Sequence, residues 1–247
     1  MNVAILLSGG KGTRMKMSVP KQLIKVNDKP LMCYALAALF NCSSIDGVQV
    51  VLEEKYRRTL MESMEGMPWR AKLLGFTKPG DTRQESIYHA LCDLEVVADE
   101  DAVVVIHDGA RPMVSCELIR KCVAEIKGYD GVLPVLAMMD TLYSCKNGTS
   151  ITGVVNRNEI YAGQAPEAFM LKKYYEANKE LARTNQLKQI TGSAEAAMYA
   201  GMNIKIIPGE QDNFKITTSS DLVKFMKMVG NNKLVERTLV YEGTDIK

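Results

Sequence analysis

Close to the N-terminus, residues 6–22 combine glycines and cations in the run LLSGGKGTRMKMSVPKQ. Glycines that follow a strand let the backbone come close to a ligand and turn its N–H groups inward. Cations in the same segment add positive charge where a polyphosphate would lie. The spacing matches neither the Rossmann GxGxxG nor the Walker GxxxxGK[ST] pattern. The segment therefore predicts a nucleoside triphosphate site of another kind, built on Gly9, Gly10 and Gly12.

The cations of this segment suit a triphosphate that is attacked at its α-phosphorus. The transition state spreads negative charge over the non-bridging oxygens and the departing pyrophosphate, so fixed cations stabilise it more than the ground state. Arg14 and Lys21 are the cations expected at the reacting phosphate, while Lys11 and Lys16 are expected to be peripheral. The competing interpretation is a solvated basic loop. The combination of glycines with several cations argues against it.

A second polar cluster follows the apolar run 102–107 (AVVVIH). Asp108 ends this run, and Gly109 and Arg111 come directly after it. Mg²⁺ takes one or two carboxylates together with phosphate oxygens, so Asp108 is a candidate metal ligand beside a nucleotide. A helix cap or an ion pair with Arg111 would explain this carboxylate equally well. His107 is expected to be a strand-end residue rather than a base.

The run 80–86 (GDTRQES) is a third polar segment, placed where a loop enters a helix. Free N–H groups at a helix N-terminus suit an anion or the edge of a nucleobase. We expect Asp81 to be the N-cap of the helix that follows. An ordinary capped helix start is the alternative interpretation of this run.

Strand-like and helix-like segments alternate along the chain, which predicts an open α/β sheet whose ligand site lies at the carboxyl ends of the strands. The strand at 102–107 is apolar throughout, as in a parallel strand buried on both faces. The expected strands are 3–7, 48–52, 71–76, 102–107, 131–138 and 203–207. The expected helices are 31–40, 55–64, 82–97, 115–127, 171–184, 194–200 and 220–229.

The alternation breaks after Met139, where residues 141–145 and 151–156 are extended runs with no helix between them. Asn147-Gly148 between these runs is a strong hairpin signal. We therefore expect a β-arm at about 139–160 that projects from the single domain 1–230. A two-stranded arm is marginal alone, so a second subunit is its expected support. No role is assigned to residues 231–247.

Composition limits the classes of partner and compartment. The 247 residues are 47% hydrophobic and 24% charged, which is ordinary for a globular domain. The net charge is only +2, so we expect neither nucleic acid nor a membrane surface as a partner. The six cysteines form no CxxC pair, which predicts buried, reduced thiols in a cytoplasmic protein.

Six motifs in the chain occur in the order of one enzyme family: SGGKGTRM followed by PKQ, GDTRQES, VIHDGARP, MDTL, NRNEIYAGQAP and NFKITTSSDL. Over about residues 3–230 the chain resembles the cytidylyltransferases of sugar-alcohol phosphates, which act on 2-C-methyl-D-erythritol 4-phosphate or ribitol 5-phosphate. The resemblance implies a homodimer with a Rossmann-like core and an interlocking β-arm. The implied reaction converts CTP and a polyol phosphate into a CDP-polyol and pyrophosphate, with Mg²⁺.

The resemblance also assigns roles to individual positions. The CTP-binding positions would be Leu7, Ser8, Gly9, Gly10, Gly12, Gly80, Asp81, Thr82, Arg83, Ser86 and Gly109. The catalytic positions would be Arg14, Lys21, Arg157 and Lys215, and the substrate-binding positions would be Asp108, Arg111, Thr141, Arg157 and Lys215. Asp108 would also hold the metal, and Asp212 and Asn213 are further candidates near it. Thr141 and Arg157 would reach the site from the arm of the partner subunit.

The chain departs from the family pattern on the side of the acceptor. Ala165 stands where the family often has a threonine, Gly192 where it often has an aspartate, and Tyr143 where a lysine is common. The run 157–164 (RNEIYAGQ) resembles the ribitol 5-phosphate branch, so that acceptor is expected. The alternatives are the methylerythritol acceptor, a nucleotidyltransferase that uses UTP or GTP, and a non-catalytic nucleotide-binding homologue.

Overall fold

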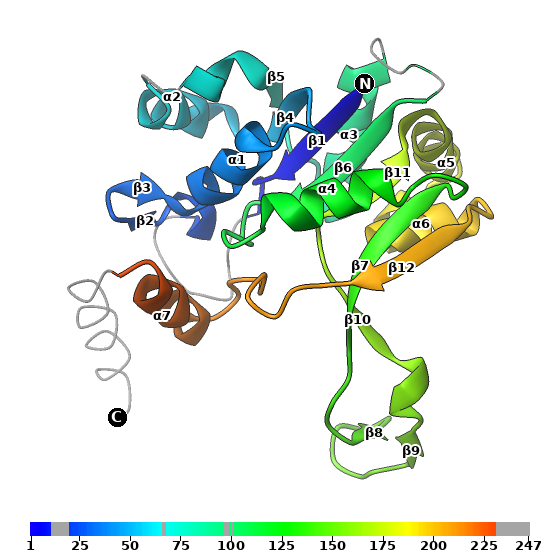
Figure 1. The fold of residues 1–247 in the computed structure, drawn as a ribbon. Coiled ribbons are helices and arrows are strands. Elements are labelled where there is room, and N and C mark those ends of the chain that lie inside the picture. Colours follow the sequence, from blue (N-terminus) through cyan, green and yellow to red (C-terminus); the bar gives the residue numbers. More distant parts are fainter. Residues whose placement is uncertain (11–19, 66–67, 96–98, 100, 231–247) are drawn as a thin grey trace.

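The computed structural model describes residues 1–10, 20–65, 68–95, 99 and 101–230, and the remaining positions are drawn in grey in Figure 1. Gly12 and Arg14, both expected at the triphosphate, lie outside the described residues, as do Lys11 and Lys16. The C-terminal segment 231–247 also lies outside them.

In the part of the chain that the structure describes, the core is one mixed sheet of eight strands in the order β10-β7-β11-β6-β1-β4-β5, with β12 paired to β7. Parallel pairing joins β6 to β1, β1 to β4, β4 to β5 and β7 to β12. The mostly parallel α/β sheet expected from the sequence is therefore confirmed. The strands are β1 (Asn2–Leu7), β4 (Gly47–Val51), β5 (Leu73–Thr77), β6 (Val103–Asp108), β7 (Gly131–Ala137), β10 (Tyr161–Gly163), β11 (Glu167–Met170) and β12 (Ile204–Pro208).

Two of these strands, β10 and β11, were not expected from the sequence. Both pair antiparallel, β10 with β7 and β11 with both β6 and β7. They carry the chain back from the arm, so the segment after residue 160 adds to the main sheet. Each strand is only three or four residues long, which is too short to show a periodic pattern.

Helices cover both faces of the sheet (Figure 1). Successive side chains of β1 point to opposite faces and therefore pack into two different apolar clusters. Ala4 and Leu6 pack with α1 and α4, whereas Val3 and Ile5 pack with α3, α5 and α6. None of the helices in the described ranges is long and apolar enough to cross a membrane. The helices are α1 (Leu31–Asn41), α2 (Glu54–Ser63), α3 (Arg83–Leu94), α4 (Cys116–Ala124), α5 (Leu171–Arg183), α6 (Ser193–Tyr199) and α7 (Ser219–Met228), with 3-10 turns η2 (Lys21–Leu23), η3 (Pro68–Lys72), η5 (Arg157–Glu159) and η6 (Leu187–Gln189).

A third apolar cluster joins α7 to the β2–β3 hairpin (Lys25–Val26 and Lys29–Pro30) and to the start of α1. Ile216 is fully buried in this cluster, and its N–H donates to the carbonyl of Ala110 at 2.8 Å. This contact holds the segment before α7 against the loop that follows β6. As a result, Lys215 reaches the carboxyl end of β6.

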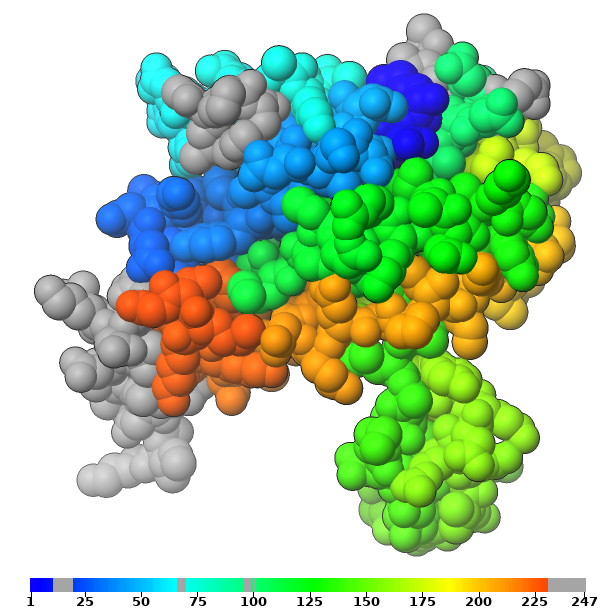
Figure 2. All heavy atoms as spheres, viewed as in Figure 1, coloured from blue at the N-terminus to red at the C-terminus, as the bar shows by residue number. Residues whose placement is uncertain are grey.

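The arm is a separate projection below the body of the molecule, as both the ribbon and the space-filling view show (Figures 1 and 2). Its strands β8 (Leu142–Ser144) and β9 (Gly153–Val155) pair antiparallel, which confirms the expected hairpin. Met139 and Val154 on the arm are 76% and 71% exposed. Apolar side chains are therefore open to solvent over the arm of this single chain.

The cysteines are free, as expected, but only half of them are buried. Cys33, Cys42 and Cys122 lie in the core, whereas Cys92, Cys116 and Cys145 are exposed. The expectation of uniformly buried thiols is wrong because Cys92 faces outward from α3 and the other two lie on α4 and on the arm.

Candidate functional site

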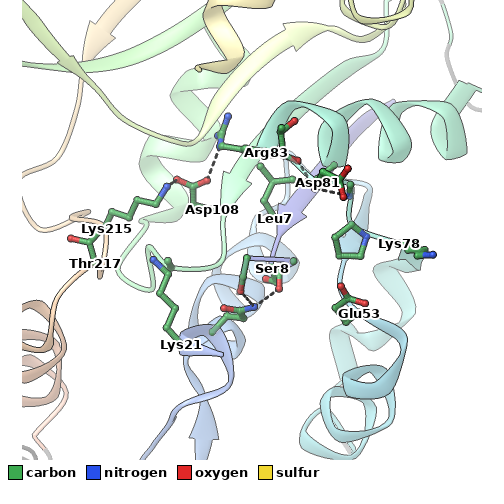
Figure 3. A pocket seen from close by; sticks show the side chains of 18 residues that line it. Leu7, Ser8, Lys21, Glu53, Lys78, Asp81, Arg83, Asp108, Lys215 and Thr217 are labelled. Atoms are coloured by element: carbon green, nitrogen blue, oxygen red, sulfur yellow. Dashed lines mark hydrogen bonds and ion pairs between the residues drawn. The ribbon is translucent and has the colours of Figure 1, made fainter. Parts of the chain in front are cut away.

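A cleft of about 830 Å³ opens at the carboxyl ends of β1 and β6, where the α/β topology predicted a ligand site (Figure 3). Residues expected at the site that line this cleft are Leu7, Ser8, Gly9, Gly10, Lys21, Gly80, Asp81, Thr82, Arg83, Ser86, Asp108 and Lys215. The structure thus brings together four parts of the sequence that lie far apart: 7–21, 80–86, Asp108 and Lys215. Lining residues that the sequence did not predict are Gln22, Glu53, Lys78, Pro79, Ala110 and Thr217.

The described start of the glycine-rich loop is closely packed. A Cβ on Gly9 would lie 2.4 Å from Cβ of Pro79, so only glycine lets these two loops approach this closely. Gln22 is buried, and its Nε2 donates to the carbonyls of Ser8 at 2.6 Å and Gly10 at 2.8 Å. Gln22 therefore ties the turn at Lys21 to the loop. Among the described residues, the buried hydroxyl of Ser8 has no hydrogen-bond partner, so it could donate to a ligand.

Lys21 lines the cleft from η2, and its Nζ donates to the carbonyl of Ile216 at 2.8 Å. This contact joins the loop after β1 to the segment that carries Lys215. Two of the predicted catalytic cations, Lys21 and Lys215, therefore line the same part of the cleft (Figure 3).

Asp108 is the centre of the site because three cations of the described residues surround its carboxylate. Oδ1 lies 3.2 Å from Nε of Arg83, and Oδ2 lies 2.9 Å from Nζ of Lys215 and 3.6 Å from Nε of Arg111. The ion pair with Arg111 was one of the interpretations left open, and it is present. The helix-cap interpretation is wrong, because Ser115 caps α4.

Charge, rather than exposure, sets the ionisation of this carboxylate. Burial by itself would raise the pKa of Asp108, but the guanidinium of Arg83 and the ammonium of Lys215 lower that pKa well below its usual range. Asp108 is therefore ionised at every physiological pH. Arg83 also remains charged, since Asp108 and Glu167 raise its pKa against the opposing effect of burial.

Thr82, rather than Asp81, is the N-cap of α3. The hydroxyl of Thr82 accepts from the N–H of Glu85 at 3.1 Å, and the carboxylate of Glu85 accepts from the N–H of Thr82 at 2.9 Å. The expected cap at Asp81 is wrong because Thr82 and Glu85 form the reciprocal capping box, a pattern visible in the sequence. Asp81 instead lines the cleft, where it is exposed.

Arg83, at the first position of α3, also contacts two residues that the sequence did not single out. Its Nη1 donates to Oγ of Ser193 at 2.5 Å, and its Nη2 lies 3.3 Å from Oε1 of Glu167. Both partners come from elements late in the chain, β11 and α6. A glutamate in an unassigned segment carries no sequence signal for such a buried role.

Gly109 and Arg111 lie beside the cleft rather than in its lining. The N–H of Gly109 donates to the carbonyl of Leu7 at 2.9 Å, which joins the ends of β1 and β6. Nη1 of Arg111 donates to the carbonyl of Asn213 at 2.7 Å, and Asn213 in turn donates to the carbonyl of Ala165 at 2.7 Å. Gly109 and Arg111 therefore hold the neighbouring segments in place without lining the cleft themselves.

Thr141 and Arg157 are not brought to this cleft. Both are exposed at the arm, where Nη1 of Arg157 donates to the carbonyl of Met139 at 2.5 Å. The predicted roles of these two residues therefore require a second copy of the chain.

Among the described residues, the carboxylates of Glu53, Asp81 and Asp108 line the cleft, and Asp108 is the one expected at the metal. Over the residues that the structure describes, no group of three or more histidine, cysteine, aspartate or glutamate side chains could hold an ion. Asp108 nevertheless fits Mg²⁺ at a nucleotide, because it is ionised and because phosphate oxygens and waters supply the remaining ligands of this ion.

Behind the cleft, His107 is fully buried at the end of β6. Its Nε2 lies 3.1 Å from the carbonyl of Arg111, so Nε2 carries the proton and donates. Burial lowers the pKa of His107 to about 4. His107 is thus a neutral structural residue, as expected, and not a general base near neutral pH.

Comparison with known proteins places the chain among nucleotidyltransferases. A family described as IspD, 2-C-methyl-D-erythritol 4-phosphate cytidylyltransferase, matches residues 2–230. A ribitol-5-phosphate cytidylyltransferase of Vibrio parahaemolyticus is 29% identical over 233 residues, which span 93% of this chain and 96% of the relative. A 2-C-methyl-D-erythritol 4-phosphate cytidylyltransferase of Rubrobacter xylanophilus is 32% identical over 226 residues, which span 90% and 91%.

A solved structure has the same fold. The crystal structure of 4-diphosphocytidyl-2C-methyl-D-erythritol synthase from Anaerococcus prevotii superposes with a TM-score of 0.78. It is 21% identical in sequence and covers 92% of this chain and 95% of its own.

The buried neutral state of His107 predicts a loss of stability in mild acid. Between its ordinary pKa of 6.5 and its folded pKa of about 4, the unfolded chain binds more protons than the folded one, so the free energy of unfolding falls as the pH falls. The His107 contribution amounts to about 3 kcal/mol between pH 7 and pH 4. His107→Gln should therefore flatten this dependence in urea unfolding measured across that range.

The matched control is His89→Gln, which changes an exposed histidine on α3 and should retain the wild-type dependence on pH. An unchanged slope in His107→Gln would contradict the assignment.

Proposed function

This chain belongs to the family of 2-C-methyl-D-erythritol 4-phosphate cytidylyltransferases, and from that premise we propose that its cleft binds CTP and a polyol phosphate. It is a CTP-dependent cytidylyltransferase. The products are a CDP-polyol and pyrophosphate, and ribitol 5-phosphate is the proposed acceptor. The observation that carries the proposal is the convergence of Lys21, Arg83 and Lys215 on one cleft around Asp108.

The reaction joins two anions, which explains the excess of cations in the cleft. A phosphate oxygen of the acceptor attacks the α-phosphorus of CTP, and the bond from that phosphorus to the bridging α–β oxygen breaks. The electron pair leaves with pyrophosphate. Because the attacking phosphate is already ionised, no general base is needed, and catalysis consists of positioning and charge stabilisation.

The described residues divide these tasks between the two substrates. At the end of β1, Gly9 and Gly10 offer backbone N–H groups to the triphosphate and Ser8 offers its hydroxyl, because the N–H of Ser8 donates to the carbonyl of Val51 at 2.9 Å. Lys21 stabilises the charge that develops at the α-phosphate. Lys215, held by Asp108, lies on the side where the acceptor phosphate would enter. Arg14 would share the task of Lys21.

Mg²⁺ is the proposed metal, held by Asp108 together with phosphate oxygens of CTP. When bound, it would neutralise charge on the triphosphate. The donor set that supports this proposal is one ionised carboxylate beside a cleft that suits phosphate.

A homodimer is proposed because the arm projects from the body with exposed apolar side chains. In such a dimer, Thr141 and Arg157 of one chain would lie at the acceptor side of the other. Burial of Met139 and Val154 between the chains would supply part of the association free energy.

The acceptor can be identified by measuring pyrophosphate release from CTP and Mg²⁺ with a panel of polyol and sugar phosphates. Relatives of this chain include enzymes named for ribitol 5-phosphate and for 2-C-methyl-D-erythritol 4-phosphate. The run RNEIYAGQ at residues 157–164 favours the first, so pyrophosphate release should be fastest with ribitol 5-phosphate. Faster release with the methylerythritol phosphate would contradict the proposed acceptor, and no release with any pentitol, pentulose or methylerythritol phosphate would contradict the proposed function.

Lys21→Ala should lower kcat by roughly 100-fold or more and weaken CTP binding by less than about tenfold, because Lys21 acts mainly on charge that develops in the transition state. Steady-state kinetics with both substrates and a CTP binding titration measure the two effects. Lys25→Ala, an exposed lysine four positions further on, is the matched control and should leave kcat within about twofold. Equal losses in kcat and in CTP affinity would exclude the transition-state role.

Mixed dimers test whether the arm acts on the partner. Lys21→Ala chains and Arg157→Ala chains, each of low activity alone, are co-expressed with different affinity tags and purified as mixed dimers. One site of each such dimer combines an intact Lys21 with an intact Arg157 arm, so about half of the wild-type turnover should return. If Arg157 acted within its own chain, both sites would carry a defect and activity would stay low.

A further inference from the structure

Glu167 is a buried carboxylate of the site that the proposed reaction does not use. It is 7% exposed, at the first position of β11. Its Oε1 accepts from the hydroxyl of Ser193 at 2.9 Å and lies 3.3 Å from Nη2 of Arg83. A buried ion pair is a poor source of stability, because desolvation of the charges offsets their attraction. The placement of Glu167 beside the cleft therefore calls for a role at the site.

Arg83 is held on three sides through three different nitrogens. Nε faces Asp108 at 3.2 Å, Nη1 faces Ser193 at 2.5 Å and Nη2 faces Glu167 at 3.3 Å. These partners belong to β6, α6 and β11, so they fix the plane of the guanidinium from independent elements. With five N–H donors on a rigid fork, Arg83 still has donors left for a ligand in the cleft that it lines.

Charge alone would make Glu167 unfavourable at an anion site. The cluster contains three cations, Arg83, Arg111 and Lys215, against two carboxylates, so each carboxylate reduces the positive charge that a triphosphate meets. What Glu167 supplies instead is orientation. It holds the outer nitrogen of Arg83 while its own oxygen is held by Ser193, and both contacts use the same atom, Oε1.

We propose that Glu167 is a positioning residue for CTP: through Oε1 and Ser193 it fixes the guanidinium of Arg83 in the orientation that binds the phosphates. The proposal rests on the CTP site proposed above. It assigns a role to a side chain that touches neither substrate, and it makes orientation, not charge, the property that matters at this position.

Two substitutions separate orientation from charge. Glu167→Gln keeps an oxygen at the place of Oε1, so the bonds from Ser193 and Arg83 persist although the negative charge is lost. Glu167→Ala removes both bonds. If orientation matters, Gln preserves function and Ala does not; if charge matters, Gln shifts anion affinity in the same direction as Ala.

The experiment titrates CTP and inorganic tripolyphosphate into the full-length wild type and both variants by calorimetry. We expect Glu167→Ala to weaken binding of both probes at least about tenfold and Glu167→Gln to stay within about threefold of the wild type. In turnover, Glu167→Ala should raise KM for CTP by a similar factor and leave KM for the acceptor within about threefold. Unchanged or tighter binding in Glu167→Ala overturns the proposal, as does an equal change in both variants.

Phe169→Leu is the control for a loss of stability. Phe169 is fully buried on the same strand and stacks on Tyr174 with ring centroids 4.2 Å apart, so its change destabilises the strand without touching Arg83. It should lower the melting temperature and leave CTP affinity unchanged. A Phe169→Leu protein that loses CTP affinity as Glu167→Ala does would reduce Glu167 to a structural role and overturn the proposal.

The binding assay also separates this inference from the proposed function. A wild-type chain that binds CTP and tripolyphosphate without turning over any acceptor contradicts the function, while the variants still decide the role of Glu167. A wild-type chain that binds neither probe contradicts both.

Discussion

The carboxylate of Asp108 is the feature on which the rest of the site depends. It ends a fully buried strand, where an isolated negative charge would be expensive to desolvate. Three cations compensate it, and each comes from a different part of the chain: the start of α3, the loop after β6 and the segment before α7. The need to neutralise one buried charge thus draws distant segments to the same end of the sheet. The cleft for the anionic substrates follows from this arrangement.

The positive charges of this cluster outnumber the negative charges of the carboxylates that contact them. Two carboxylates face three cations in the described cluster, and Lys21 adds a further positive charge to the lining of the cleft. A triphosphate and a second phosphate supply the missing negative charge. The substrates therefore complete an electrostatic arrangement that the folded chain leaves positive, which is consistent with a reaction driven by positioning and charge.

Most of this site could be predicted from the sequence because its parts have local signatures. Gly9 and Gly10 follow an apolar strand, Asp108 ends another, and the run 80–86 opens a helix, although its cap is Thr82 and not the expected Asp81. Such patterns depend on neighbours within a few residues. The parallel pairing of the strands, though not their order in the sheet, follows from the alternation of strands and helices.

The parts that could not be predicted depend on contacts between distant segments. Glu167 is an ordinary glutamate in the sequence, and it becomes a buried partner of Arg83 only because β11 enters the sheet between β6 and β7. Gln22 holds the glycine loop only after the turn at Lys21 has folded back on it. The return of the chain through β10 and β11 was missed for the same reason, since a strand of three or four residues is defined by its neighbours and not by its own pattern.

The route of the chain around the arm has a mechanical consequence. The arm leaves the sheet from β7 and returns along β10, and only Gln164, Ala165 and Pro166 separate the end of β10 from Glu167. A displacement of the arm would therefore have only a short covalent path to Glu167, the proposed positioning residue for Arg83. The arm, which is the proposed contact with a second chain, and Glu167, which lies beside the proposed nucleotide site, are thus connected through one short stretch of backbone.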